Sequence, residues 1–252
     1  MALAFALDGN LVLCFTAGPR EVGTVHRETA SPALNSEAVP VEFTRALLAQ
    51  ARAHDRDIDA IVRAARFPRD ALRSDAQAAG VSREQYSRLC LQLIRELGDE
   101  SVGVMPDVQT PLGTTRLIAL SILNSATLAA AMRRAIDFNR ACRVRRGARV
   151  VNELRFDGTS REATLSYLHG DDSRESQHRV LCNLAMWMRF CGWLIGQQID
   201  ITSATCAGPR PAFMAGIRHF FPCPVAYDRP CNSVTFSARH LDAALIRDEA
   251  DL

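Results

Sequence analysis

Apolar side chains recur at helical spacing throughout residues 172–197, which include both tryptophans of the chain. One row along this stretch consists of Val180, Leu184, Trp187, Cys191 and Leu194. Leu181, Met188 and Ile195 form a second row, and a helix that is apolar on nearly all sides is a buried one. Asn183, Arg189 and Gly192 interrupt the run, so it is too short to span a membrane. The pattern therefore predicts a long core helix.

Shorter amphipathic helices are predicted before this core helix. Their apolar periodicity covers residues 41–48, 58–65, 82–97, 114–123 and 128–136. Ser82 and Gln85 have the spacing of a capping box at the start of the third helix, and Gly98 ends that helix. Asn124 or Ser125 is expected to cap the fifth helix.

The period changes from helical to alternating after residue 150. Residues 150–156 and 163–168 alternate around a turn at 157–160, which predicts a β-hairpin. Further strands are expected at 199–206, 224–227 and 233–236, with a short helix at 211–221 and a helical turn at 240–246. Helices followed by strands indicate an α+β fold: an N-terminal helical part, then a mixed sheet packed on a long buried helix.

This order suggests a flexible leader and one domain. Residues 17–40 are rich in Pro, Gly, Ser, Thr and Glu, so residues 1–39 are interpreted as the leader. The domain then covers residues 40–252, with a helical part at 40–146 and a sheet-plus-helix part at 147–252.

The composition narrows the class of protein. The chain has 252 residues, 48% of them hydrophobic, and a net charge of +2, which gives no general electrostatic attraction to nucleic acid or anionic membranes. Its 8 cysteines include no C-x-x-C pair, so no zinc ribbon is indicated. Cysteines within apolar helical runs favour a reducing, cytoplasmic compartment, and no signal peptide or membrane span is expected.

A narrow polar arc on the core helix is the first candidate for a binding site. His178, Cys182 and Arg189 fall within about 40° of each other at roughly 100° per residue. A buried guanidinium needs an anionic partner: a ligand carboxylate is one candidate, and an internal acid or solvent exposure is the alternative. The full candidate set for ligand binding is Arg189, His178, Cys182, Tyr167, His169 and Trp187.

Several short motifs occur in a characteristic order. They are Leu97–Gly103, Leu123–Leu128, Phe220–Val225, Asn232–Ser237, Leu241 and Arg247–Glu249. Their order and spacing resemble the N-terminal effector-binding domain of AraC/XylS-type bacterial transcriptional regulators, in the branch that includes relatives of the ornithine-utilisation regulator. The resemblance covers roughly residues 40–252, and the C-terminal motifs contribute most to it.

The resemblance implies an α+β module that senses a small molecule and dimerises. The expected effector is a small metabolite, and Arg189 makes a carboxylate-bearing compound one candidate. The resemblance also implies a homodimer, no catalysis, and contact with DNA only through a C-terminal helix-turn-helix domain that this chain lacks. No cofactor and no metal are expected. The family supplies no constant binding residue, so none is transferred to this chain.

Two other classes remain open. Residues 75–96 resemble a helix-turn-helix whose second helix would present Arg83, Gln85, Ser87 and Arg88 to a DNA groove; an ordinary helical hairpin is the alternative. His178 and Cys182, and likewise His219 and Cys223, are four residues apart, as in a Cys2His2 metal site or a Cys-His nucleophile. Core thiols and surface imidazoles are the alternative, and no oxyanion-hole motif accompanies these pairs.

Overall fold

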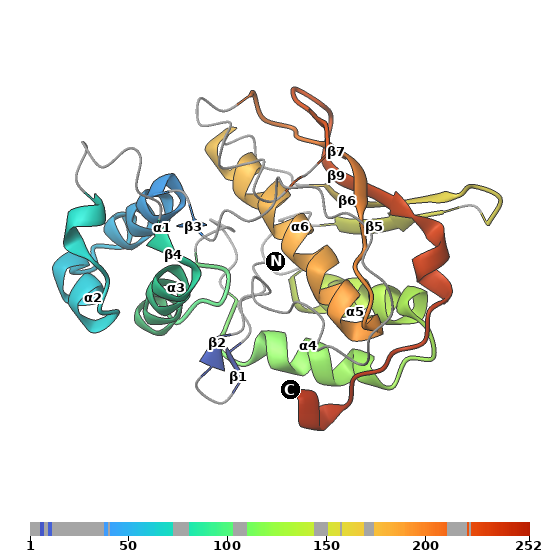
Figure 1. The fold of residues 1–252 in the computed structure, drawn as a ribbon, viewed down its shortest axis with the longest axis horizontal. Coiled ribbons are helices and arrows are strands. Elements are labelled where there is room, and N and C mark those ends of the chain that lie inside the picture. Colours follow the sequence, from blue (N-terminus) through green and yellow to red (C-terminus); the bar gives the residue numbers. More distant parts are fainter. Residues whose placement is uncertain are drawn as a thin grey trace, which may run out of the picture.

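The computed structural model describes residues 6–7, 10–11, 38–39, 41–72, 81–102, 110–143, 151–156, 158–168, 174–210, 221 and 223–252. Within these ranges the chain forms six α-helices and a five-stranded mixed sheet, which confirms the α+β prediction. Helices α1–α3 lie together on one side of the molecule, and the sheet with α4–α6 forms the other side (Figure 1).

The first group of helices packs through apolar faces. It comprises α1 (Val41–Ala53), α2 (Ile58–Ala64), the 3-10 helix η1 (Arg69–Leu72) and α3 (Arg83–Leu97). The capping box predicted for α3 is present: the Ser82 hydroxyl accepts from the Gln85 N–H at 3.1 Å, and Gln85 Oε1 accepts from the Ser82 N–H at 2.9 Å. Gly98 ends α3 with a φ of 62°, as its position predicts.

Short strands accompany this group. β3 (Ala38–Val39) pairs antiparallel with β4 (Val81–Ser82), directly before α3, and β1 (Ala6–Leu7) pairs with β2 (Asn10–Leu11).

Two adjacent buried carboxylates organise the loop between α3 and α4 (Thr114–Leu123). Asp99 Oδ1 accepts from the backbone N–H groups of Ser101 and Thr110, each at 2.8 Å. Glu100 accepts from the N–H of Gly113 at 2.6 Å and from that of Thr115 at 2.7 Å. Because the first N–H groups of a helix have no partner within it, Glu100 satisfies the start of α4.

The hairpin predicted after residue 150 is present, and it belongs to the five-stranded sheet. The strands are β5 (Val151–Arg155), β6 (Glu162–Leu168), β7 (Ile201–Thr205), β8 (Val225–Ala226) and β9 (Asn232–Ser237), in the order β5-β6-β9-β7-β8. Only the β7–β8 pair is parallel. Ala163, Leu165 and Tyr167 alternate along β6 and are all buried, so one face of the sheet belongs to the core.

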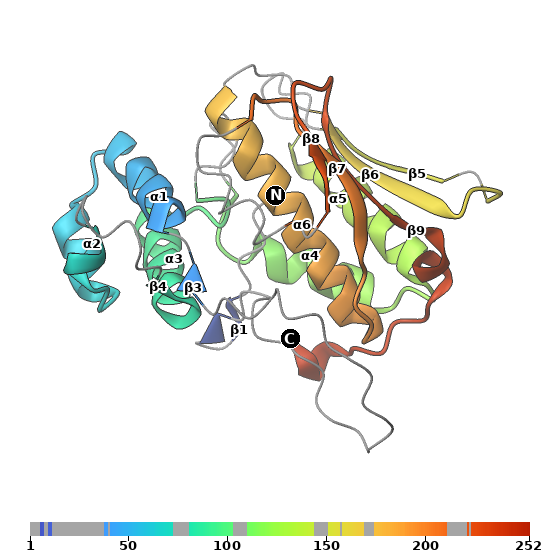
Figure 2. The same cartoon turned by 45° about the horizontal axis from the view of Figure 1, so that its top comes forward.

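Helices α5 (Leu128–Arg143) and α6 (Arg174–Ile195) cover this apolar face of the sheet (Figures 1 and 2). The core helix predicted at 172–197 is therefore confirmed as α6, and both of its predicted apolar rows are buried. Leu128, Met132, Ala135 and Ile136, the predicted inner face of α5, are buried as well.

Some local predictions differ from the structure. The helix α5 is capped by Thr127, whose hydroxyl accepts from the Ala130 N–H at 3.3 Å, and not by Asn124 or Ser125. The turn expected at 240–246 is a 3-10 helix, η2 (Ala238–Asp242), and the chain continues without helix to η3 (Glu249–Asp251). The helix expected at 211–221 lies almost entirely outside the described residues.

Candidate functional site

A small pocket lies between α5, α6 and the edge of the sheet. The residues lining it are Ile136, Asn139, Asn152, Tyr167, Val180, Asn183, Leu184 and Trp187. Its interior has room for about one water molecule in this conformation. Among the described residues that line it, none carries a charge.

Strand register and helical period bring these side chains together. Asn152 on β5 is directly opposite Tyr167 on β6, so both point to the same face of the sheet. That face is the one covered by helices, because Tyr167 is only 2% exposed. On α6 the lining residues are spaced i, i+3, i+4 and i+7, which places them on one side of the helix.

Asn183 is the most informative residue in the pocket. It is only 7% exposed, and its Oδ1 atom is buried without a hydrogen-bond partner among the described residues. A buried carbonyl oxygen needs a hydrogen-bond donor, which the protein, a water molecule or a ligand can supply. Asn139 of α5, 5% exposed, adds a second buried amide to the same wall. Such an arrangement is typical of a site that is completed by another molecule.

The side chains of three candidate residues from the sequence, Tyr167, Trp187 and Arg189, lie in the described part of the structure. Tyr167 and Trp187 line the pocket. Arg189 is half-buried and does not line it. At about 100° per residue, Arg189 lies roughly 170° around the helix from the centre of the pocket-lining row. Arg189, the charged residue of the polar arc, therefore lies on the opposite face of α6. His169 and the side chains of His178 and Cys182 lie outside the described part of the structure.

The amides of the pocket were missed in the sequence interpretation, although the pattern contains a signal for them. Asn183 shares a helical face with Val180, Leu184 and Trp187, and Asn139 follows buried Ile136 by three residues on α5. A polar amide within an apolar helical row is unusual, because its burial requires hydrogen-bond partners. Asn152 could be identified only once the register with β6 was known.

The C-terminal end of α6 lies next to the end of the described chain. Ile246 donates its N–H to the Leu194 carbonyl at 2.9 Å, and Arg247 Nε donates to the Trp193 carbonyl at 3.0 Å. On the other side, the Ala243 carbonyl accepts from the N–H of Leu128, the first residue of α5, at 2.9 Å. Residues 243–247 thus connect the start of α5 with the end of α6, the two helices that form the pocket.

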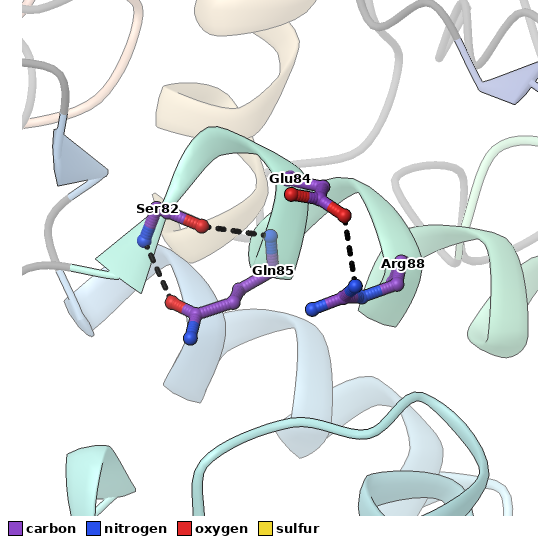
Figure 3. A network of polar contacts seen from close by, with 4 residues as sticks. All are labelled: Ser82, Glu84, Gln85 and Arg88. Carbon is purple, nitrogen blue, oxygen red and sulfur yellow. Dashed lines mark hydrogen bonds and ion pairs between the residues drawn. The ribbon is translucent and has the colours of Figure 1, made fainter.

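The start of α3, which the helix-turn-helix alternative would place in a DNA groove, is engaged in contacts within the protein. Gln85 takes part in the capping box, and Arg88 forms an ion pair with Glu84 at 2.8 Å (Figure 3). The opposite face of α3 is buried in the core, with Leu89 and Leu93 fully covered. Residues 73–80, the turn of that motif, are outside the described ranges.

The thiols of Cys90, Cys206 and Cys223 are poorly reactive at neutral pH. Burial raises the pKa of Cys90 to about 12, and it also raises the pKa of Cys206 and Cys223. These thiols stay protonated at neutral pH, and the thiol is a poor nucleophile and metal ligand. Within the described ranges no group of three or more His, Cys, Asp or Glu side chains is arranged to hold a metal ion. The expected pairing of His219 with Cys223 involves a residue outside those ranges.

The chain thus combines an α+β fold with a small pocket, lined by amide and apolar side chains, between two helices and the edge of the sheet. Residues 56–245 match the family model described as the arabinose-binding domain of AraC transcription regulators, N-terminal. This match covers most of the chain, so the chain belongs to that family. It is a ligand-sensing regulatory domain of a transcription regulator.

A transcriptional regulator is among the solved structures that this chain resembles. The transcriptional regulator CdpR from Pseudomonas aeruginosa is similar, with 14% sequence identity and a TM-score of 0.41. The similarity covers 81% of this chain and 57% of the CdpR chain, so the present chain spans less than two thirds of that regulator's length. No curated protein matches the sequence. None of the helices in the described residues is long and apolar enough to cross a membrane.

Proposed function

We propose that the pocket between α5, α6 and the β5–β6 edge is the effector site of this regulatory domain. The observation that supports it is the buried, unpartnered Oδ1 of Asn183 in the pocket wall. A fold tolerates such an atom at a binding site because the ligand supplies the missing hydrogen bond. The domain binds its effector and performs no chemistry.

The effect of binding is carried by the two helices of the pocket. In this conformation the pocket has room for about one water molecule, so an effector larger than a few atoms must widen the space between α5 and α6. Residues 243–247 are hydrogen-bonded to both helices and therefore move or strain with that separation. The effector shifts the domain towards the open arrangement to the extent that it binds that arrangement more tightly.

The remaining partners are part of the same proposal. A DNA-binding domain with helix-turn-helix units responds to the shift and contacts the promoter. The domain forms a homodimer in a bacterial cytoplasm. The net charge of this chain is only +2, which gives it little attraction to DNA phosphates. This agrees with contact to DNA through a separate domain.

The location of the site can be tested by filling the pocket. Val180→Phe and Ile136→Phe introduce a ring into it from α6 and α5, respectively. Melting temperatures are measured across a panel of metabolites, and the compounds that stabilise the wild type are expected to lose their effect in both variants. Arg189→Gln is the matched control on the opposite face of α6, and it should respond like the wild type. If Arg189→Gln alone abolishes the response, the site lies at Arg189 and the proposal is wrong.

A further inference from the structure

We infer that the effector donates a hydrogen bond to Asn183 Oδ1 and brings no anionic group into the pocket. This inference rests on the proposed effector site and specifies its ligand chemistry. It differs from the carboxylate-bearing effector expected from the sequence, because that expectation depended on Arg189.

The polar groups of the pocket are uncharged. They are the amides of Asn139, Asn152 and Asn183 and the phenol of Tyr167. Asn183 Oδ1 is an acceptor that lacks a donor among the described residues, so the complementary ligand group is a hydroxyl, an amide N–H or an amine N–H. Amides both donate and accept, and they therefore match hydroxyl and amide groups better than carboxylates, which only accept.

An anion would lose its hydration here with no cationic side chain among the described lining residues to offset the loss. A carboxylate or phosphate is stable in a buried site when a cation or several donors neutralise it, and no cationic side chain is among the described lining residues. Arg189 lies on the far side of α6. The dipole of α5 also disfavours an anion in the pocket. Asn139 is one turn from the C-terminal end of α5, where the helix dipole is negative.

The apolar residues of the pocket wall indicate that the ligand also has a hydrocarbon surface. Ile136, Val180 and Leu184 supply aliphatic surface, and Trp187 supplies an aromatic one. A ligand with donor groups on one side and a hydrocarbon face on the other fits this division. The structure assigns the donor side to Asn183 and its neighbouring amides.

Asn183→Leu tests the inference directly. Leucine replaces the amide with an apolar group of similar size, so the unpartnered acceptor disappears. The melting temperature without ligand is expected to rise by a few degrees, and the affinity for a stabilising donor-bearing compound to fall by at least about tenfold. A structural asparagine would behave in the opposite way, because its removal would lower the melting temperature.

Thr44→Val is the matched control. Thr44 on α1 is fully buried, and its Oγ1 also lacks a hydrogen-bond partner among the described residues, but it does not line the pocket. The variant removes the same kind of defect elsewhere in the fold. It should be at least as stable as the wild type and should keep the full ligand response.

Two matched probe pairs test the charge of the effector: glucose with gluconate, and glycerol with glycerate. The uncharged member of each pair is expected to raise the melting temperature of the wild type more than its acid. Stabilisation by the acid member alone, with loss of that effect in Asn183→Leu, overturns the inference while leaving the effector site in place. If probes stabilise wild type, Asn183→Leu, Val180→Phe and Ile136→Phe alike, the effector site itself is wrong.

If no probe stabilises the wild type, the melting temperatures of the wild type and Asn183→Leu without ligand still test the inference. A melting temperature of Asn183→Leu above that of the wild type then supports the unsatisfied acceptor. A melting temperature clearly below it shows that Asn183 is structural and overturns the inference.

Discussion

Arg247 holds Trp193 through two different contacts. Its Nε donates to the Trp193 carbonyl at 3.0 Å, and its guanidinium carbon lies 5.1 Å from the centre of the indole ring. Gly196 donates to the same carbonyl at 3.2 Å, and Gln197 donates to the Gly192 carbonyl at 3.0 Å, as in a Schellman motif. Together with the Ile246 N–H on Leu194, these contacts satisfy carbonyls that the end of a helix leaves open.

Arg247→Ala is expected to lower the free energy of unfolding by about 1–3 kcal/mol. The variant loses a charge-assisted hydrogen bond and a cation–π contact at the end of α6. Urea unfolding followed by tryptophan fluorescence measures the change and reports on the environment of Trp193.

Arg247→Lys separates the two contacts. Lysine keeps the positive charge near the indole but lacks the planar Nε donor, so an intermediate stability is expected. Equal stability of Arg247→Ala and the wild type would show that this contact does not hold the C-terminal segment on α6.

Gly192→Ala tests the close approach inside the same motif. A Cβ at this position would lie 2.6 Å from the Gln197 carbonyl oxygen, which is backbone and cannot rotate away. The Schellman turn must therefore shift, and a loss of about 1–3 kcal/mol is expected from this overpacking despite the better helix propensity of alanine. Thermal unfolding is the measurement. Ser87→Ala on the half-buried face of α3 is the control, and a Gly192→Ala variant as stable as that control would contradict the expectation.

The regular elements could be predicted from the sequence because their signals are local. Helix α3 carries its own capping box and C-terminal glycine, and α6 carries two continuous apolar rows. The cap of α5 could not be assigned in the same way. Asn124, Ser125 and Thr127 all have capping side chains, and the choice depends on the contact of the Leu128 N–H with the distant Ala243 carbonyl.

The pocket could not be predicted from the sequence either, because it is formed by residues that are far apart along the chain. Its walls come from four elements, and the register of β5 with β6 decides that Asn152 faces the helices. From the sequence, Arg189 was the most conspicuous polar residue of the core helix because it is charged. The structure places the pocket on the other face, where the polar signal is only the weaker amide of Asn183.

Glu100→Ala is expected to lower the free energy of unfolding by about 2–4 kcal/mol. The buried carboxylate accepts two backbone N–H groups at the start of α4, and its removal leaves both without a partner. Glu100→Gln retains one acceptor oxygen, so about half of that loss is expected. Glu96→Gln, an exposed change on α3, is the matched control and should remain within about 0.5 kcal/mol of the wild type. Denaturant unfolding of the three variants gives the comparison.

His240 makes stability depend on pH. It is 4% exposed, and burial, followed by the charge of Arg239, lowers its pKa below the ordinary value, although Asp200 partly opposes this. Below about pH 6.5 the unfolded chain binds a proton that the folded protein does not bind, so the free energy of unfolding decreases as the pH falls from that value through the folded pKa. Above pH 6.5 the contribution of His240 is constant.

Replacing His240 by Gln should remove this part of the pH dependence. Urea unfolding at a series of pH values between 8 and 5 measures it, and the slope of stability against pH is expected to be smaller in His240→Gln than in the wild type. His54→Gln, which replaces an exposed histidine after α1, is the control variant. A slope that is unaltered in His240→Gln would show that another group titrates in this range. A slope that becomes steeper would mean that His240 is protonated more readily in the folded protein than in the unfolded chain.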